Sequence, residues 1–210
     1  ITNCSISILL DNSSNNNTIA ENNIAYNGAH CRGIDVWNSS NNTIAGNNIT
    51  APDVYYATLG ILLSRSSNTT IEGNKITNTM FGIYVSQSSN SILKDNLMSD
   101  NLYNFGVYGT ELAHYVHDID SSNTVDGKPV YYWINHQNEN IPADAGYIAL
   151  VNSTHIAVQN LNLKNNKQGV LLAYTKNSII TGNNITKNEM GVCLWDSSNN
   201  TMGGNNIAYN

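Results

Sequence analysis

The 210-residue chain has few charged residues, few prolines and no long apolar run. Only 11% of its residues are charged, and nine Lys and Arg are outnumbered by fifteen Asp and Glu. Because no basic stripe could replace phosphate counterions, a nucleic-acid partner is disfavoured. No segment approaches the ~20 apolar residues of a membrane span, so we expect none here. The hydrophobic fraction of 40% still supplies a sizeable core, which argues against disorder.

The apolar spacing of amphipathic helices is also missing, and asparagine is abundant instead, at 38 positions. SSNNTIAGNNIT at 39–50 returns almost unchanged as SSNNTMGGNNIA at 197–208. A second phrase, Gly-apolar-x-apolar, recurs as GIDV, GILL, GIYV, GVLL and GVCL. Short T-I or S-I and N-x-I runs follow each copy. Three short runs in every ~22 residues are typical of a β-solenoid.

We therefore predict an all-β fold for residues 1–210, a single-domain right-handed parallel β-helix with three short strands per ~22-residue coil and about eight coils. Gly and Asn tolerate the left-handed dihedrals of coil corners. Asparagines at one corner of successive coils should form a hydrogen-bonded ladder: Asn22, Asn47, Asn74, Asn96, Asn183 and Asn205. Leu161 takes this position in its own coil and should interrupt the ladder.

The core should consist of the inward residues of each short run, at period two. They are predicted to be Ile34, Val36, Ile44, Ile49, Ile61, Leu63, Ile71, Ile76, Ile83, Val85, Ile92, Val107, Ile148, Leu150, Val158, Leu161, Leu163, Val170, Leu172, Ile180, Ile185, Val192, Leu194 and Ile207. The repeat fails most clearly at 109–146, which we interpret as one coil with an excursion. The chain starts without Met and stops in mid-phrase, so we expect a fragment of a longer protein.

An outward column of the Gly-apolar-x-apolar strands is too apolar for bare solvent: Asp35, Leu62, Tyr84, Tyr108, Ala149, Leu171 and Cys193. Either the excursion, through Tyr131, Tyr132 and Trp133, or a partner protein should cover it. Internal cover is the favoured alternative.

The phrases GIYVSQSSNSILKDN and GVLLAYTKNSIITGNNIT resemble the right-handed parallel β-helix repeats of the NosD-like, carbohydrate-binding and sugar-hydrolase superfamily. NTVDGKPVYYW, followed by AGYIALVNSTHIAVQNLNLKNN, is similar to the version found in archaeal surface proteins. The resemblance covers nearly the whole chain. It implies one of three roles: a cell-surface structural or adhesive module, polysaccharide processing, or maturation of a periplasmic copper enzyme. The N-T-D, D-D, H-G and R-I-K motifs of polygalacturonase-like members do not occur.

The leading hypothesis is an extracellular cell-surface module, of the S-layer or adhesive kind, that is not an enzyme. Its partner would be a polysaccharide or cell-envelope glycan, or neighbouring copies of the same protein. The alternatives are a polysaccharide lyase or glycoside hydrolase, and a periplasmic NosD-type copper-maturation accessory. Recurrent N-x-S/T sequons agree with a secreted glycoprotein.

Candidate carbohydrate-binding residues combine aromatic faces, which stack on sugar rings, with polar groups, which bind hydroxyls. The aromatic candidates are Trp37, Tyr174 and Trp195. The polar candidates are Asp35, Arg65 and Asp196. Coil counting places Trp37 and Trp195 roughly 30 Å apart, which suits a long polysaccharide track better than one compact site.

HYVHDID, at 114–120, is the densest ionisable cluster of the chain. If they converge, His114, His117, Asp118 and Asp120 could bind a divalent metal ion. His117, Asp118 and Asp120 could also supply a catalytic acid and base, with Arg65 or Lys94 neutralising a uronate. The simpler alternative is a solvated excursion with incidental histidines. No cofactor is otherwise expected.

Cys4 and Cys31 lie about one coil apart at near-equivalent positions, so we predict a disulfide between them. Cys193 is several coils away and cannot join them. Methionines are spread one per coil, and neither Cys nor Met forms the cluster that copper delivery would favour.

Overall fold

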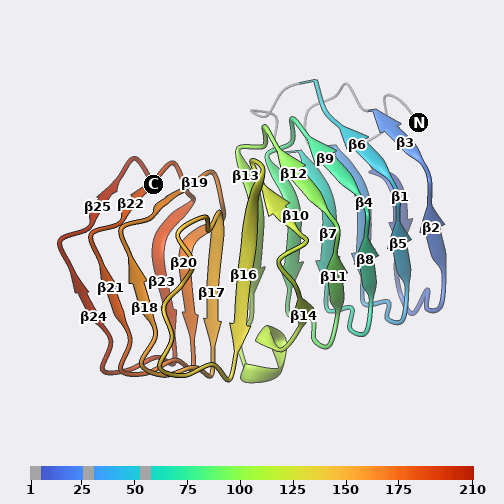
Figure 1. The fold of residues 1–210 in the computed structure, drawn as a ribbon. Helices are drawn as coiled ribbons and strands as arrows, with labels where there is room; N and C mark the ends of the chain where they lie inside the picture. The colour runs from blue at the N-terminus through green and yellow to red at the C-terminus, as the bar shows by residue number, and fades with distance from the viewer. Residues whose placement is uncertain (1–5, 26–30, 53–57) are drawn as a thin grey trace.

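The computed structural model describes residues 6–25, 31–52 and 58–210, and it is an all-β parallel β-helix of about nine coils, one more than predicted (Figure 1). Within these residues there is no α-helix and one 3-10 turn, η1 (Leu112–Tyr115). Strands three places apart in the chain pair in parallel, and the right-handed β-helix predicted from the repeat is confirmed. No helix of the described ranges has the length and apolar character needed to cross a membrane.

In the described part of residues 6–125, the first stack has three faces of five strands each. Sheet 1 contains β1 (Ile6–Leu10), β4 (Arg32–Trp37), β7 (Leu59–Ser64), β10 (Phe81–Ser86) and β13 (Tyr103–Tyr108). Sheet 2 contains β2 (Thr18–Ala20), β5 (Thr43–Ala45), β8 (Thr70–Glu72), β11 (Ile92–Lys94) and β14 (Asp118–Ile119). Sheet 3 contains β3 (Asn23–Ala25), β6 (Asn48–Thr50), β9 (Lys75–Thr77), β12 (Leu97–Ser99) and β15 (Thr124–Val125).

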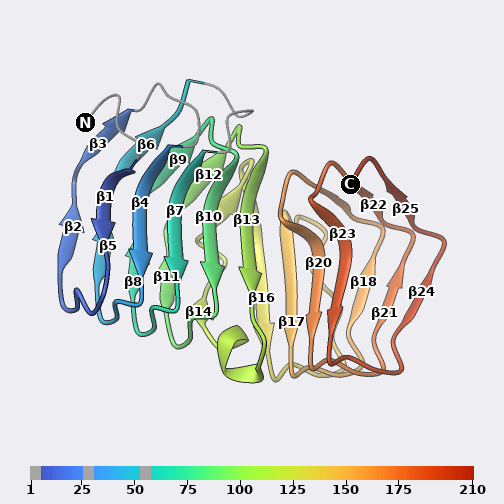
Figure 2. The same ribbon diagram turned by 180° about the vertical axis from the view of Figure 1, so that it is seen from behind.

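The second stack, residues 128–210, repeats this plan with fewer coils (Figure 2). Sheet 4 contains β16 (Lys128–Ile134), β17 (Tyr147–Val151), β20 (Gln168–Ala173) and β23 (Met190–Trp195). Sheet 5 contains β18 (Ala157–Gln159), β21 (Ile179–Thr181) and β24 (Thr201–Gly203). Sheet 6 contains β19 (Asn162–Lys164), β22 (Asn184–Thr186) and β25 (Asn206–Ala208).

An antiparallel hairpin joins the two stacks. β15 pairs with β16 in the antiparallel sense, through Thr124 with Pro129 and Val125 with Lys128. The turn residues Asp126 and Gly127 have φ angles of 49° and 75°. Asp-Gly suits a two-residue hairpin turn in which both residues need positive φ. This one reversal makes sheet 3 of the first stack continue into sheet 4 of the second.

Most predicted inward residues are buried, and one was assigned to the wrong face. Ile92 is 41% exposed, whereas its neighbour Leu93 is 1% exposed and fills the core position. A strand shifted by one residue exchanges its two faces. Leu194 and Ile207 are 38% and 49% exposed because, in the described chain, no further coil stacks on theirs.

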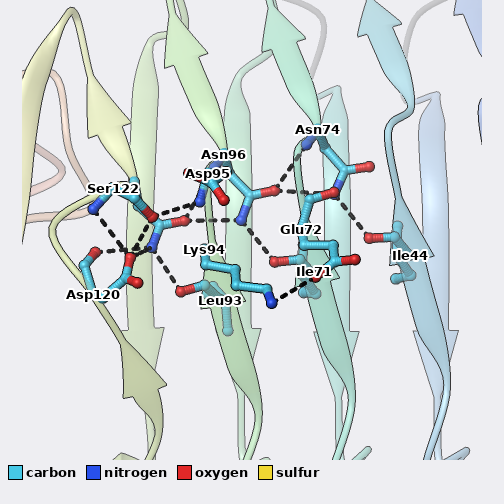
Figure 3. Close-up of polar contacts among 11 residues, drawn as sticks. Ile44, Ile71, Glu72, Asn74, Leu93, Lys94, Asp95, Asn96, Asp120 and Ser122 are labelled. Atoms are coloured by element: carbon cyan, nitrogen blue, oxygen red, sulfur yellow. Dashed lines mark hydrogen bonds and ion pairs between the residues drawn. The ribbon is translucent and has the colours of Figure 1, made fainter.

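The asparagine ladder is confirmed and is longer than predicted (Figure 3). Asn74 Nδ2 donates to Asn96 Oδ1 at 3.0 Å and to the Ile44 carbonyl at 2.9 Å. Asn96 Nδ2 donates in turn to Asn123 Oδ1 at 2.8 Å, and Asn123 was not in the predicted set. Leu161 donates its N–H to Asn183 Oδ1 but has no side-chain oxygen to accept a bond, so the ladder is interrupted there.

The outer face of sheet 4 is buried against the end of the first stack. Ala149 and Leu171 belong to the same buried cluster as the core of the first stack. The rings of Phe105 and Tyr147 meet edge to face, with centres 5.0 Å apart. Gln168 Nε2 donates to the Val107 carbonyl at 2.9 Å. These contacts tie the two stacks together.

The first stack therefore covers the column members Ala149 and Leu171, Lys167 of the second stack contacts Tyr84, and the predicted aromatic residues supply only part of the cover. Tyr132 lies in the shared cluster, whereas Tyr131 and Trp133 pack against the second stack's own core. Tyr108 also leaves the column, because the strand register aligns Tyr84 with Gly106.

Candidate functional site

A row of side chains crosses the outer face of sheet 1 at the carboxyl ends of its strands. Trp37 of β4 aligns with Ser64, Ser86 and Tyr108 on the next three strands. Trp37 is 43% exposed and Tyr108 is 36% exposed. Three strand spacings, roughly 14 Å, separate these two aromatic residues. Only small serine side chains lie between them.

Two longer polar side chains follow this row at the coil corner. Arg65 and Gln87 both have left-handed φ angles, 49° and 48°. The Arg65 guanidinium carbon lies 5.9 Å from the centre of the Trp37 ring, and Arg65 Nε donates to Gln87 Oε1 at 3.0 Å. A hollow of about 310 Å³ opens beside them, with Ser67 and His114 on its other walls. Gln87 was missed, although it follows Arg65 by one coil at the same corner.

The row continues across the junction onto the second stack. The Trp195 ring lies edge to face with Tyr108, with centres 6.3 Å apart. Coil counting along one axis did not predict this contact, because the second stack does not simply continue the first. We call the continuous set Trp37, Arg65, Gln87, Tyr108 and Trp195 the aromatic strip.

The remaining carbohydrate candidates have different environments. Tyr174 is half-buried, and its ring centre lies 6.5 Å from that of Tyr115. Asp196 is exposed at the corner after Trp195. Asp35 is only 2% exposed and forms an ion pair with Arg32, so a ligand on the surface does not reach it.

His117 is a structural part of the coil. Its side chain is 4% exposed, and Nδ1 accepts the Ser91 N–H at 3.3 Å. Its Nε2 lies 3.1 Å from the His114 carbonyl oxygen. Burial lowers the pKa of His117 to about 4, so the ring is neutral at pH 7. One coil earlier, the Ser91 hydroxyl accepts the Thr69 N–H in the same way. His117 therefore extends a column of side chains that each accept a backbone N–H from the coil before.

His114 and Asp118 lie on different elements, η1 and β14. In η1, His114 Nε2 is 3.2 Å from Glu111 Oε1 and Nδ1 accepts the Thr110 N–H at 3.2 Å. Asp118 is exposed on β14.

Asp120 belongs to a coil corner. Asp120 Oδ1 accepts bonds from the N–H and the hydroxyl of Ser122, and the Ser122 hydroxyl accepts the Asp95 N–H at 2.7 Å (Figure 3). Over residues 6–25, 31–52 and 58–210, no three His, Cys, Asp or Glu side chains come together as metal ligands. Catalytic and metal roles for His114, His117, Asp118 and Asp120 stay predictions.

The donors in the described part of the chain do not fit a copper ion, which favours thiolate, thioether and imidazole ligands held together. Cys31 is buried, and Met98 is 1% exposed in the core. Cys193 is half-buried at the junction, and burial raises the pKa of its thiol. Cys4 lies outside the described residues, so its disulfide with Cys31 stays a prediction.

Comparison with known proteins connects the whole chain to one family. A family model described as "Periplasmic copper-binding protein (NosD)" matches residues 1–127 and 130–210, and the two residues left out lie in the β15–β16 hairpin. No curated protein matches the chain. Among solved structures, HetL, a pentapeptide repeat protein involved in heterocyst differentiation regulation in the cyanobacterium Nostoc, is 9% identical with a TM-score of 0.17. That match covers 91% of this chain and 85% of HetL.

Proposed function

Since the chain belongs to the NosD family, we propose that it is a β-helix module that works outside the cytoplasm and binds a polysaccharide along the aromatic strip. The observation that carries this proposal is the alignment of Trp37, Tyr108 and Trp195 across both stacks. Sugar rings present C–H patches to aromatic faces and hydroxyls to planar polar groups such as those of Arg65 and Gln87. An extended glycan suits the strip because the aromatic rings of the strip are spread over a distance longer than one sugar unit.

The surrounding fold supports a binding role. The strip lies on paired strands, and the ladders at the coil corners hold the backbone in place. A rigid rod with a glycan-binding edge would serve as a cell-surface or periplasmic module attached to envelope polysaccharide. Neighbouring copies of the chain could bind the same polymer.

A glycan array with the whole chain tests the proposal. Trp37→Ala and Trp195→Ala should each weaken binding roughly three- to tenfold, the usual contribution of one aromatic contact. Leu97→Ala is the matched control, because Leu97 is 52% exposed on sheet 3, away from the strip. Absence of any bound glycan, or an equal loss in the control, would contradict a binding strip.

The lyase or hydrolase alternative has weaker support. Both ring nitrogens of His117 are engaged inside the coil, so a general base would have to be Asp118 or Asp120. An assay for chain cleavage, compared between wild type and Asp118→Asn, distinguishes an enzyme from a binding module. Titration with Cu(I) and Cu(II) by calorimetry, with Asp118→Ala as control for the His/Asp cluster, tests the binding that the family description names.

A further inference from the structure

A cleft opens between the two stacks at the other end of β13 from the aromatic strip. Its volume is about 620 Å³. The first stack lines it with Asp100, Leu102 and Tyr103, and the second with Asn165, Lys187 and Tyr209. In Figure 2 the start of β13 lies toward the side of the first stack that faces the C-terminal coils. Tyr103 and Tyr108 are the first and last residues of β13, so roughly 17 Å of strand separates the cleft from the strip.

The walls of this cleft are held by backbone and ladder hydrogen bonds. Beside it, the Asn104 N–H donates to the Asn165 carbonyl at 2.6 Å and joins the two stacks. Asn101 and Asn188, which form ladder bonds at a different coil corner from the ladder described above, line it as well, and each accepts a backbone N–H from the preceding coil, at 2.9 and 3.0 Å. A site with walls fixed in this way loses little entropy when a ligand binds.

Four of the lining residues stand at equivalent corners of the coils. Asp100, Asn165, Lys187 and Tyr209 have φ angles between 57° and 58°. Asn165, Lys187 and Tyr209 lie on successive coils of the second stack, so their backbones are about 4.8 Å apart from one coil to the next. Opposite them, Asp100 belongs to the first stack. The cleft therefore has two walls that only the junction brings together.

The chemistry of these walls favours a neutral, hydroxylated ligand. Tyr103, Tyr209 and Leu102 provide apolar faces. Asp100 is the one carboxylate of the lining and Lys187 the one ammonium, so a strongly charged ligand of either sign meets repulsion as well as attraction. The hydroxyl groups of a neutral ligand can donate hydrogen bonds to the Asp100 carboxylate and accept them from the Lys187 ammonium. The volume lies in the range of pockets for small ligands.

We propose that this junction cleft is a second binding site, for one or two neutral sugar units, separate from the aromatic strip. The sugar is either a free disaccharide or the end of a polysaccharide chain. This site does not depend on the strip, because the two share no residue.

Ligand-observed and protein-observed NMR titrations with cellobiose, maltose and N,N′-diacetylchitobiose test the proposal. At least one disaccharide should perturb the Tyr103 and Tyr209 resonances at tens of millimolar or below. Tyr209→Ala should weaken binding roughly three- to tenfold without loss of fold, since Tyr209 is 89% exposed. Leu102→Trp should fill the cleft and abolish binding, with circular dichroism to confirm folding. Leu97→Ala, at an exposed residue of sheet 3 outside both sites, should leave the perturbation of Tyr103 unchanged.

The outcomes separate the two sites. Binding followed at Tyr103 that weakens in Tyr209→Ala, disappears in Leu102→Trp and persists in Leu97→Ala supports the cleft, whatever the strip does. If Trp37→Ala removes it and the cleft variants keep it, the cleft proposal is wrong and the strip proposal stands. If none of the three disaccharides perturbs the Tyr103 and Tyr209 resonances, a polysaccharide with free chain ends is titrated next. Perturbation by the polysaccharide identifies chain ends as the source of the ligand, and no perturbation by it overturns the cleft proposal.

Discussion

Sheets 1 and 4 are built from the same Gly-apolar-x-apolar phrase, yet their outer faces have opposite environments. Ser86 ends β10 in GIYVS and is half-buried, whereas Ala173 ends β20 in GVLLA and is fully buried. The hairpin at Asp126 and Gly127 redirects the second stack, so that sheet 4 covers the end of the first stack. One phrase thus produces a surface in one stack and an interface in the other. Its inward residues are interchangeable between stacks, and its outward residues are not.

Because both stacks contribute to one buried cluster, we propose that they unfold together as a single domain. Figure 1 shows where they meet, at β13 and β16. The following predictions alter one stack at a time and compare it with the other.

The largest effect should come from a charge placed in the interface. Ala173→Asp buries a carboxylate without a partner and should lower the free energy of unfolding by about 4 kcal/mol. Ser86→Asp, at the equivalent strand position of sheet 1, should cost less than about 1 kcal/mol because solvent reaches it. Urea unfolding followed by circular dichroism measures both. Equal losses at the two positions would show that the outer faces do not differ.

A pH dependence should come next, and it should arise from the first stack. Burial lowers the pKa of His117 from 6.5 in the unfolded chain to about 4 in the fold. Between these values the unfolded chain binds the proton and the folded protein does not. Stability is therefore full above pH 6.5 and falls as the pH is lowered toward 4, by up to about 3 kcal/mol.

His117→Asn isolates this contribution, because Asn42 fills the same column in an earlier coil and accepts the Asn17 N–H. The variant keeps an acceptor for Ser91 and removes the titration. Its unfolding free energy, measured from pH 7 to pH 4.5, should change less than that of wild type. Parallel pH curves for the two proteins would disprove the assignment.

Breaking the ladder should have a moderate effect that depends on position. Asn96→Leu introduces leucine at a ladder position of the first stack, as the second stack has naturally at Leu161. The Asn74 N–H and the Ile71 carbonyl would lose buried partners, at a cost of about 2 kcal/mol. Asn205→Leu, in the half-exposed last coil, should cost about half as much because water can replace the lost bonds. Chemical unfolding measures the loss of unfolding free energy in both variants, and a larger loss in Asn205→Leu than in Asn96→Leu would contradict the prediction.

The smallest effect should come from a cation at the junction. Lys167 of the second stack is only 7% exposed, and its Nζ lies 5.1 and 4.7 Å from the ring centres of Phe81 and Tyr84 in the first stack. Glu189 Oε2 accepts a bond from the same Nζ at 2.6 Å. Lys167→Met should destabilise by about 1 kcal/mol. Lys176→Met, at an exposed lysine of the same stack, is the control and should be near neutral in thermal unfolding.

Prediction from sequence succeeded where the repeat itself supplies the information. The coil, its three strands and the ladder follow from the spacing of the repeated phrases. The interruption of the ladder follows from a single residue, Leu161. Ile92 was assigned inward because NSILKDN contains two adjacent apolar residues, and period two fits either register. Asn123 was left out of the ladder because it lies within 109–146, where the repeat fails most clearly.

The candidate site could be predicted only in pieces. Trp37, Arg65 and Trp195 were identified as residue types suited to sugars, but the sequence placed the tryptophans at distant coils. Gln87 and Tyr108 joined them only through the parallel register of sheet 1 and the contact across the junction. His117 was identified as reactive because its sequence neighbours are ionisable, whereas its burial is a property of the packed coil.

The sequence by itself determined the β-helix and the double use of asparagine, at ladders and at left-handed corners, because each coil contacts the next at a constant separation. Only the tertiary structure decided how the two stacks meet, which face of sheet 4 is buried, and where the strip and the cleft lie. Those features depend on contacts such as Gln168 with Val107, 61 residues apart and outside any repeat. A periodic pattern encodes interactions at its own period, and the junction is the place where the period fails.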